Sequence, residues 1–407
     1  METTTLTADL FVSVDGWARG EHSPGYFGYF GPELERWIFD ELSRPQHVLM
    51  GRRTYEALAA LSNDVRDEGY HRVTRLTTTV FSRTLDGVDW PNATIESRDA
   101  VESVRALKDA TDVPLRTMGS LSVVQQLLNA GLVDRLRLMV FPLLVGPSGR
   151  ESVVELAAPP THSPTPLARR RATSSPKAVR LQGPRVPTEA NWRGSSARCT
   201  RGCPRDAKKR RRQVMAKVIF DISMSLDGFM TAANQRPEEP MGEGGEQLVQ
   251  WAVGDNPADR EVLTGGVAGL GAVIAGRRTY DTSLPWWGAD GPTGPARVPV
   301  FVLSHDEPED TPAGGVYTFV TGGIEDALKQ AKAAAGDKYV TVMGGADTGQ
   351  QYLRAGLVGE LSIHLIPVLF SSGTRMFEHL GNGHVQLEHL GSVQTAAATH
   401  LRFRVVR

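Results

Sequence analysis

The pentapeptide Gly-Arg-Arg-Thr-Tyr occurs at residues 276–280 and recurs letter for letter at residues 51–55. A short apolar run, Gly271–Ala275, stands before the later occurrence and predicts a buried strand that ends at Gly276. The residues after Gly276 predict the start of a helix, so the motif marks a strand-to-helix junction. Because the same junction occurs in both halves, the sequence contains one structural module twice.

Four more landmarks recur in the same order in both halves. They are Ser13–Gly16 with Ser225–Gly228, Met118-Gly119 with Met343-Gly344, Gly131–Val133 with Gly356–Val358, and Pro142–Leu144 with Pro367–Leu369. The residue numbers of the first pair differ by 212, whereas those of every later pair, and of the Gly-Arg-Arg-Thr-Tyr motif, differ by 225. A net insertion of 13 residues therefore lies early in the second copy, and we expect most of it around residues 256–271.

The chain of 407 residues is long enough for two domains of ordinary size. We expect a first copy at residues 5–156, a linker at 157–214 and a second copy at 215–407. The linker holds 15 Lys and Arg residues against two acidic ones, with eight prolines and no apolar periodicity, so we expect it to be disordered. Its basic clusters, Arg169–Arg171 and Lys208–Arg212, would allow nucleic-acid binding or a localisation role, which is the less favoured interpretation.

The two copies end differently. The second copy continues into residues 385–388 and 399–405, two alternating stretches that predict a closing β-hairpin. The first copy has no such pattern, because Pro-, Ser- and Arg-rich sequence follows Arg150. A frameshift near codon 150, with Met215 as the start of a separate second protein, would explain the missing hairpin and the composition of the linker. A natural fusion is the alternative.

The composition is that of an ordinary globular protein. Hydrophobic residues make up 40% of the chain, charged residues make up 22%, and the net charge is −1, so the overall charge does not favour nucleic acid or a membrane surface as a partner. No apolar run approaches the roughly 18 residues of a membrane span, and the N-terminus lacks a signal-peptide pattern. Cys199 and Cys203 both lie in the linker, so no disulfide framework supports either copy. We expect a cytoplasmic protein without a metal site.

Strands and helices alternate along the second copy. The predicted strands are residues 217–223, 271–275, 298–304, 317–320, 339–343 and 361–368, and the predicted helices are residues 246–253, 324–335 and 347–355, with a further helix that begins at Arg277. This alternation predicts an α/β fold in which helices cover both faces of a mostly parallel central sheet. The closing hairpin adds an antiparallel edge to this three-layer sandwich.

Two strand-to-helix junctions could hold the phosphates of a dinucleotide. At Gly344-Gly345 the backbone can approach a pyrophosphate closely, while the next helix offers free N–H groups and the positive end of its dipole. A tight turn is the alternative. At the other junction, Arg277, Arg278 and Thr279 could bind a second anionic group, with two solvated arginines as the alternative. No G-x-G-x-x-G sequence occurs in the chain, so a Rossmann-type site is disfavoured.

Together these motifs resemble the dihydrofolate-reductase-like fold and, within it, the riboflavin-biosynthesis reductase (RibD C-terminal) domain family. The resemblance rests on the Ser-x-Asp-Gly turn, the Gly-Arg-Arg-Thr-Tyr junction, strands that end in Phe81-Ser82 and Leu303-Ser304, and the strand-to-helix double glycine. It covers about residues 5–150 and 215–407. It implies two tandem reductase-like domains that use NADPH.

The resemblance also implies how the second copy would hold NADPH. The adenosine 2′-phosphate would be bound by Arg277, Arg278 and Ser304, and the pyrophosphate by Thr279, Gly344 and Gly345. The matching residues of the first copy are Arg52, Arg53, Thr54, Ser82 and Gly119. In the first copy, however, Ser120 replaces the second glycine, and its Cβ would crowd a pyrophosphate. We therefore expect the second copy to be the functional one.

Two further features are candidates for contacts with a substrate. Asp227, and Asp15 in the first copy, could orient the substrate or help to supply the proton that accompanies hydride transfer. An Asp-Gly turn chosen for its backbone geometry is the alternative. Trp286 and Trp287 could form the wall of a site for a flat heterocycle, with core packing as the alternative. The first copy has no tryptophan pair at that position.

By resemblance, the substrate would be a pyrimidine or pterin-like heterocycle. The activity would be similar to that of 5-amino-6-(5-phosphoribosylamino)uracil reductase in riboflavin biosynthesis. The chain has no C-x-x-C pair, so we do not expect the zinc deaminase domain that often accompanies such reductases. A folate-type reductase, with Glu246 as the candidate acid, and a non-catalytic nucleotide-binding scaffold are the alternatives. The copies could associate as a homodimer of chains or as an intrachain pseudo-dimer.

Overall fold

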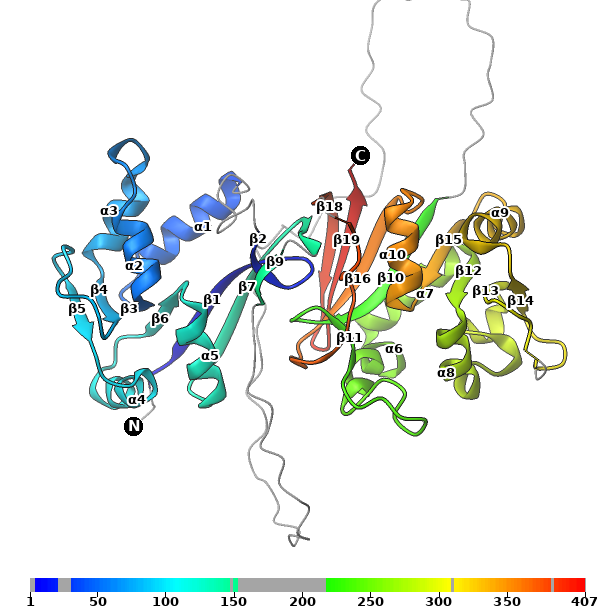
Figure 1. Cartoon of the computed structure of the whole chain (residues 1–407), viewed down its shortest axis with the longest axis horizontal. Coiled ribbons are helices and arrows are strands. Elements are labelled where there is room, and N and C mark those ends of the chain that lie inside the picture. The colour runs from blue at the N-terminus through cyan, green and yellow to red at the C-terminus, as the bar shows by residue number, and fades with distance from the viewer. Residues whose placement is uncertain are drawn as a thin grey trace, which may run out of the picture.

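The computed structural model describes residues 4–20, 31–146, 149–152, 217–308, 311–381 and 384–406. These residues form two α/β halves that lie side by side (Figure 1). The predicted linker, residues 157–214, lies outside the described residues, together with its two cysteines and both basic clusters.

The first copy contains a six-stranded sheet in which all neighbouring strands are parallel, in the order β5-β4-β3-β6-β1-β7. Its strands are β1 (Leu6–Ser13), β3 (His47–Gly51), β4 (Thr77–Phe81), β5 (Ala93–Glu96), β6 (Leu115–Met118) and β7 (Arg135–Phe141). Its helices are α1 (Pro32–Leu42), α2 (Arg52–Ala59), α3 (Glu68–Arg75), α4 (Ala100–Ala110) and α5 (Leu121–Asn129). The strands β2 (Trp17–Gly20) and β9 (Gly149–Ser152) form a separate antiparallel pair.

The second copy repeats this arrangement and extends it. Six parallel strands in the order β14-β13-β12-β15-β10-β16 continue into the antiparallel strands β19 and β18. The strands of this sheet are β10 (Val218–Ser225), β12 (Leu270–Gly276), β13 (Val300–Leu303), β14 (Tyr317–Val320), β15 (Tyr339–Met343), β16 (Glu360–Ile366), β18 (Val385–Gln394) and β19 (Thr399–Val405). The strands β11 (Phe229–Ala232) and β17 (Gly373–Arg375) form a separate antiparallel pair. The helices are η4 (Gly245–Val249), α6 (Gln250–Val253), α7 (Pro257–Ala268), α8 (Arg277–Trp287), α9 (Gly323–Ala335) and α10 (Ala346–Arg354). The predicted α/β sandwich and its antiparallel edge hairpin are confirmed.

The strand β12 is apolar throughout because helices cover both faces of the sheet. In β12, Val273 and Ile274 are both fully buried, yet they belong to different clusters, since successive side chains of a strand point to opposite faces. Val273 packs with Tyr280 of α8, and Ile274 packs with Ala327 of α9.

The net insertion lies earlier in the second copy than the sequence predicts. β2 and β11 still align in the register of the two Ser-x-Asp-Gly turns, whereas the starts of α1 and α7, Pro32 and Pro257, already align in the register of the later landmarks. The additional residues therefore lie in residues 233–256, which contain η4 and α6, and the expectation of residues 256–271 is wrong. That segment forms α7, because Asn256 caps the helix by accepting hydrogen bonds from the backbone N–H groups of Ala258 and Asp259, and Pro257 fits the first helical position.

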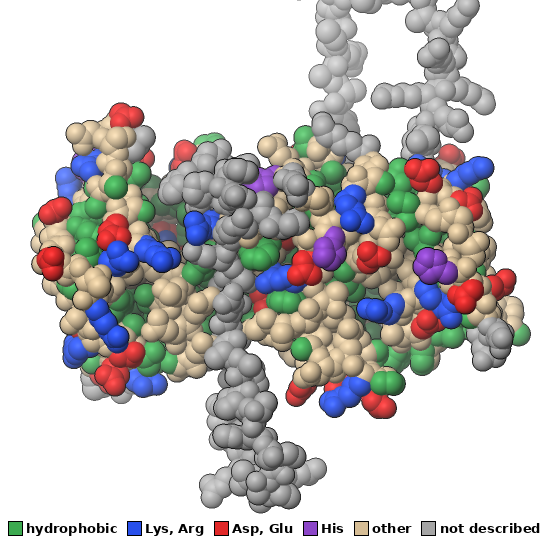
Figure 2. Space-filling model, viewed as in Figure 1, with side chains coloured by type: hydrophobic (Ala, Val, Ile, Leu, Met, Phe, Trp, Pro, Cys, Tyr) green, Lys and Arg blue, Asp and Glu red, His purple; other side chains and the backbone are tan. Residues whose placement is uncertain are grey.

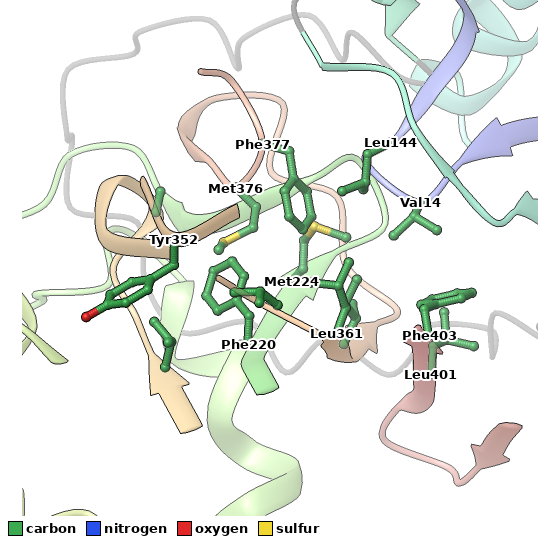
Figure 3. Packing of buried hydrophobic residues seen from close by; sticks show 14 of the residues in the cluster. Val14, Leu144, Phe220, Met224, Tyr352, Leu361, Met376, Phe377, Leu401 and Phe403 are labelled. Carbon is green, nitrogen blue, oxygen red and sulfur yellow. The ribbon is translucent and has the colours of Figure 1, made fainter. Parts of the chain in front are cut away.

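The two copies pack directly against each other. β8 (Leu143–Leu144) of the first copy pairs with β18 of the second, with Leu144 opposite Val385, and the Leu387 N–H group donates a hydrogen bond to the Pro142 carbonyl (3.0 Å). Val14 and Leu144 belong to the same buried cluster as Leu361 (Figure 3). The core of the second copy therefore includes side chains of the first.

The Asp-Gly turns of the two copies also meet, in a reciprocal way. A Cβ added to Gly16 would lie 2.9 Å from the Asp227 carbonyl carbon, and one added to Gly228 would lie 2.6 Å from the Asp15 carbonyl oxygen. Both glycines have positive φ, +80° and +91°. Reciprocal contacts of this kind are typical of a two-fold interface, here between two halves of one chain.

The closing hairpin breaks this symmetry. A cavity of about 520 Å³ lies between the copies. Its lining residues are Leu128, Gly131, Val133, Asp134 and Leu136 of the first copy and Leu226, Pro367, Val368 and Leu369 of the second. The two-fold relation between the copies maps this cavity onto the place that the closing hairpin of the second copy occupies. There the Val405 N–H group donates a hydrogen bond to the Gly359 carbonyl, and the Leu387 N–H group donates one to the Pro142 carbonyl. In the described part of the first copy, β7 is the edge of its sheet.

Acidic and basic side chains are mixed over the visible face of both halves (Figure 2), as the net charge near zero implies. Among the helices described, none combines the length and the apolar character that crossing a bilayer requires.

Candidate functional site

Two strand-to-helix junctions of the second copy meet at one edge of the sheet. β12 and β15 are parallel neighbours, so Gly276 and Gly344 follow carboxyl ends that lie side by side. The Gly276 N–H group donates a hydrogen bond to the Gly344 carbonyl (3.3 Å). The helices α8 and α10 both begin here, so their unpaired N–H groups and positive dipole ends are at the same edge.

The double glycine allows the two junctions to approach closely. The Gly344–Gly345 peptide bond is cis, and Gly344 has a φ of +59°. A Cβ on Gly344 would lie 3.3 Å from the Thr279 hydroxyl oxygen. Within the described residues this hydroxyl has no hydrogen-bond partner, so it is available to an anionic ligand.

Arg277 is engaged by neighbouring side chains, whereas Arg278 is exposed. The Arg277 Nη1 atom lies 3.1 Å from Ser304 Oγ and 3.2 Å from Asp306 Oδ1, and its Nε atom lies 2.8 Å from Asp281 Oδ1. Ser304 thus lies beside Arg277, as the resemblance implies for a 2′-phosphate site. Two carboxylates share the arginine, and the more exposed of them, Asp306, could move away from it, since its side chain is 82% exposed.

The same junctions in the first copy are closed by Ser120. This residue has a φ of +60°. Its Oγ atom accepts a hydrogen bond from the Gly51 N–H group (2.5 Å) and lies 2.7 Å from Thr54 Oγ1. The Ser120 hydroxyl thus accepts the hydrogen bond from Gly51, whereas in the second copy the Gly344 carbonyl accepts the corresponding bond from Gly276. The same serine hydroxyl is also hydrogen-bonded to the Thr54 hydroxyl.

The remaining predicted residues of the first copy do not form an arginine–serine pair. Arg52 donates two hydrogen bonds to Glu56 on the next turn of α2 (3.0 and 3.1 Å). Ser82 Oγ instead accepts hydrogen bonds from the backbone of Thr84 and Leu85. Arg53 is exposed, and Gly119 has a φ of +60°, like Gly344.

Asp227 and Asp15 are fully buried anchors of neighbouring loops. Asp227 accepts hydrogen bonds from Ser225 Oγ (2.7 Å) and from the Ser371 backbone N–H (2.7 Å). Asp15 accepts from the Val145 and Gly146 backbone N–H groups (3.1 and 2.7 Å), while burial raises the pKa of its carboxyl group. Both lie at the contact between the copies, so this geometry favours the turn interpretation over a proton donor.

The tryptophan pair lies at the opposite end of α8 from Arg277. Trp286 is 69% exposed, and Trp287 packs beside the cluster that contains Tyr280 and Val300. Trp287 therefore supports the core-packing interpretation, while Trp286 lies on the surface.

Comparison with known proteins decides the family. The family model described as the RibD C-terminal domain matches residues 4–175 and 216–401. The chain belongs to the RibD C-terminal domain family. The uncharacterized protein YyaP of Bacillus subtilis (strain 168) is 27% identical over 147 residues, which is 35% of this chain and 76% of that protein.

Solved structures with similar folds include two relevant examples. A putative riboflavin biosynthesis protein from Shewanella sp. PV-4 is 22% identical, with a TM-score of 0.37, and the match covers 47% of this chain and all of that one. A dihydrofolate reductase from Enterococcus faecalis, complexed with NADP(H), is 15% identical, with a TM-score of 0.32 over 48% of this chain and 98% of that one.

The second RibD C-terminal domain also contains a polar cluster that the sequence analysis missed. On the face of the sheet beneath α7, His364 of β16 lies opposite His400 of β19, and their hydrogen bonds extend to Asp221 and Asp259. The available signal was periodic, since Asp221, Ser223 and Ser225 place a polar residue at every second position of an otherwise apolar strand. Among the described residues, no group of three or more His, Cys, Asp or Glu side chains has a metal-binding arrangement.

Proposed function

We propose that the second RibD C-terminal domain is an NADPH-dependent reductase and that the first is a partner domain without a working cofactor site. The observation that carries the proposal is the contrast at the junctions. In the second copy, the Thr279 hydroxyl is free beside two helix N-termini, whereas in the first copy the equivalent hydroxyl of Thr54 is bonded to Ser120. A pyrophosphate could accept hydrogen bonds from Thr279 and from the first N–H groups of α10.

The adenosine 2′-phosphate would lie against Arg277, Arg278 and Ser304. Arg278 is exposed and has no side-chain partner within the described residues, so its charge is available at once. Arg277 would exchange its exposed partner, Asp306, for the phosphate. We therefore expect a preference for NADPH over NADH, moderated by the two carboxylates.

The substrate would be a pyrimidine or pterin-like heterocycle, similar to 5-amino-6-(5-phosphoribosylamino)uracil. Membership of the RibD C-terminal domain family supports this proposal. The folate-type alternative needs an acid that faces the pterin. Glu246 is exposed in the short helix η4, so the structure does not favour it as that acid.

The test is NADPH oxidation by the full chain, followed by loss of cofactor absorbance. The substrates are 5-amino-6-(5-phosphoribosylamino)uracil, its dephosphorylated form and 7,8-dihydrofolate. Turnover of a ribosylamino-pyrimidine supports the proposal, and turnover of dihydrofolate alone supports the folate-type alternative. Tight NADPH binding without turnover on any of the three would favour a non-catalytic scaffold.

A further inference from the structure

Four side chains of the second copy form one continuous hydrogen-bonded chain. Asp221 Oδ1 lies 3.1 Å from His364 Nε2, His364 Nδ1 lies 2.7 Å from His400 Nδ1, and His400 Nε2 lies 2.9 Å from Asp259 Oδ1. The two imidazoles and Asp259 are almost completely buried. The Trp251 ring lies tilted against His364 with a centroid distance of 4.0 Å and covers the imidazoles. We call these four residues the Asp–His–His–Asp chain.

Its two ends lie in different environments. Asp221 is 35% exposed and pairs in the sheet with Met343, the residue directly before Gly344. It therefore lies beside the junction that the proposed function assigns to the cofactor. Asp259 is 1% exposed, and its Oδ2 atom is buried without a hydrogen-bond partner. One end of the chain thus reaches the candidate site, while the other ends in the protein interior.

The hydrogen bonds define how many protons the chain carries. Each of the three contacts needs one hydrogen, so three hydrogens are shared by two carboxylates and two imidazoles. That is one proton more than two carboxylates and two neutral imidazoles would hold. Moving each hydrogen across its own contact transfers the additional proton from the Asp259 end to the Asp221 end without breaking any contact. The Asp–His–His–Asp chain is therefore a store for one mobile proton.

The surrounding groups favour a carboxylate at Asp221, so at rest the additional proton is not on that end of the Asp–His–His–Asp chain. Burial lowers the pKa of His400, and a positive charge on His364 lowers it further, so a second proton is resisted. Burial raises the pKa of Asp221, but the charge and hydrogen bond of His364 and the hydroxyl of Ser362 outweigh this effect, and the net pKa lies below its ordinary value. Arg402 of β19 also faces Asp221, and it forms an ion pair with Glu360 (3.1 Å).

The first copy has fixed charges at the same place. Asp9 is the counterpart of Asp221, and both of its oxygens accept hydrogen bonds from Arg137 (2.6 and 2.7 Å), with a further bond from Arg116. Met139 occupies the position of His364. Because arginine does not give up its proton and methionine cannot carry one, the first copy has no mobile proton here.

We propose that Asp221 is the catalytic proton donor of the second copy, supplied through His364, with His400 and Asp259 as positioning residues. The inference rests on the proposed reductase function. In the balanced step, the carbon of a substrate C=N or C=O bond takes a hydride from the reduced nicotinamide, which becomes oxidised. The nitrogen or oxygen takes a proton from Asp221 as the His364 Nε2–H proton moves across its contact onto that carboxylate. His364 is left with one proton fewer, and the Asp–His–His–Asp chain regains a proton from water.

The first test reads the stored proton without turnover. NMR spectra of the full chain with ¹⁵N-labelled histidine should show three N–H hydrogens on the His364 and His400 rings at neutral pH, or two when the third is on a carboxyl group. One of them should bridge the two Nδ1 atoms and couple to both nitrogens. His364→Met, which introduces the residue of the first copy, should remove the bridge. Two neutral rings with no coupling between the Nδ1 atoms would overturn the proposal.

The second test reads proton delivery during turnover of 5-amino-6-(5-phosphoribosylamino)uracil or whichever of the three substrates reacts. Asp221→Asn should leave the NADPH dissociation constant unchanged and lower kcat by about 100-fold or more. His364→Met should move the apparent pKa of kcat, whereas His389→Gln, on the exposed part of β18, should change neither quantity.

The outcomes separate the two proposals. Turnover with an unchanged kcat and pH profile in Asp221→Asn and His364→Met would overturn the proton-delivery role and leave the reductase function standing. NADPH binding without any turnover would overturn the reductase function and, with it, the delivery role. A loss of stability in His364→Met without a shift of the apparent pKa of kcat would mean that the Asp–His–His–Asp chain has only a structural role. That result would also overturn the inference.

Discussion

Residue 345 and its counterpart in the first copy, Ser120, show how one side chain changes a junction. Gly345 leaves the Thr279 hydroxyl unbonded, whereas the Ser120 hydroxyl bonds to both Gly51 and Thr54. The sequence predicts that this serine would crowd a phosphate. In the structure it does more, because it satisfies the donors that a phosphate would otherwise attract.

Ser120→Gly should open the first copy to NADPH. The substitution frees the Gly51 N–H and Thr54 hydroxyl groups and suits the positive φ at this position, so the fold should be retained. Isothermal titration calorimetry should then detect weak additional NADPH binding that the parent chain lacks. Unchanged binding would mean that Arg52, engaged by Glu56, or another feature closes the site as well.

Arg277→Ala should reduce the affinity for NADPH far more than the affinity for NADH. A charge-assisted hydrogen bond contributes about 1.5–3 kcal/mol, which corresponds to a loss of roughly 10- to 100-fold in NADPH affinity. Titration of the variant with both cofactors checks this, and Arg260→Ala, an exposed arginine of α7, is the matched control. Equal losses for the two cofactors would contradict the assignment of the 2′-phosphate.

Sequence motifs identified the two strand-to-helix junctions but not the surroundings of the other candidate side chains. The junctions at Gly276-Arg277 and Gly344-Gly345 were predictable because an apolar strand ends at each of them and a helix follows. The roles of Asp227 and Trp287 were not, because an Asp-Gly turn or a tryptophan pair has the same sequence whether it contacts a ligand or the protein itself. The Asp–His–His–Asp chain joins residues from four separate elements, so the polar alternation of β10 could point to Asp221 but not to its partners.

Among the elements, the buried strands were predictable from apolar runs and the closing hairpin from alternating residues, whereas helix α7 was not predicted. Helix α7 contains Gly265 and Gly266 and lacks a clear apolar stripe, so its sequence resembles an insertion. Only the Asn256 cap and Pro257 mark its beginning. Tertiary contacts fix this helix, since Asp259 in its first turn bonds to His400 of β19.

The contact between α7 and the hairpin should make the second copy sensitive to acid. The folded-state pKa of His400 is lowered, so the unfolded chain takes up a proton more readily below the ordinary histidine pKa of about 6.5. The free energy of unfolding should therefore decrease as the pH falls below that value. Denaturant titrations at pH 8 and pH 5.5 check this, and His400→Gln should reduce the difference. An equal loss of stability on acidification in both proteins would contradict the role of His400.

At the scale of the whole molecule, the two copies are arranged like the subunits of a dimer, and among the described residues the closing hairpin belongs to the second copy. The Asp-Gly turns meet reciprocally, and β8 of the first copy adds to the hairpin of the second. The cavity between the copies lies where a hairpin of the first copy would complete the symmetry. The buried side chains of Val14 and Leu144 in the first copy complete the core of the second.

Substitution at the meeting of the turns tests this arrangement. Gly16→Ala places a methyl group against the Asp227 backbone, whereas Gly131→Ala, with a similar positive φ of +65°, meets open space. The control should lose about 1–2 kcal/mol of stability from its backbone conformation alone, and Gly16→Ala should lose a further 1–3 kcal/mol, roughly, from overpacking. Thermal unfolding measures both, and equal losses would contradict direct packing of the two copies.

The central claim is that one of the two domains binds the cofactor, and the stoichiometry of NADPH binding tests it most directly. Calorimetric titration of the full chain should give one NADPH per chain. Gly345→Ser, which introduces the serine of the first copy at a position where its Cβ has room, should abolish that binding without unfolding the protein. Two NADPH molecules per parent chain, or full binding by Gly345→Ser, would contradict the account.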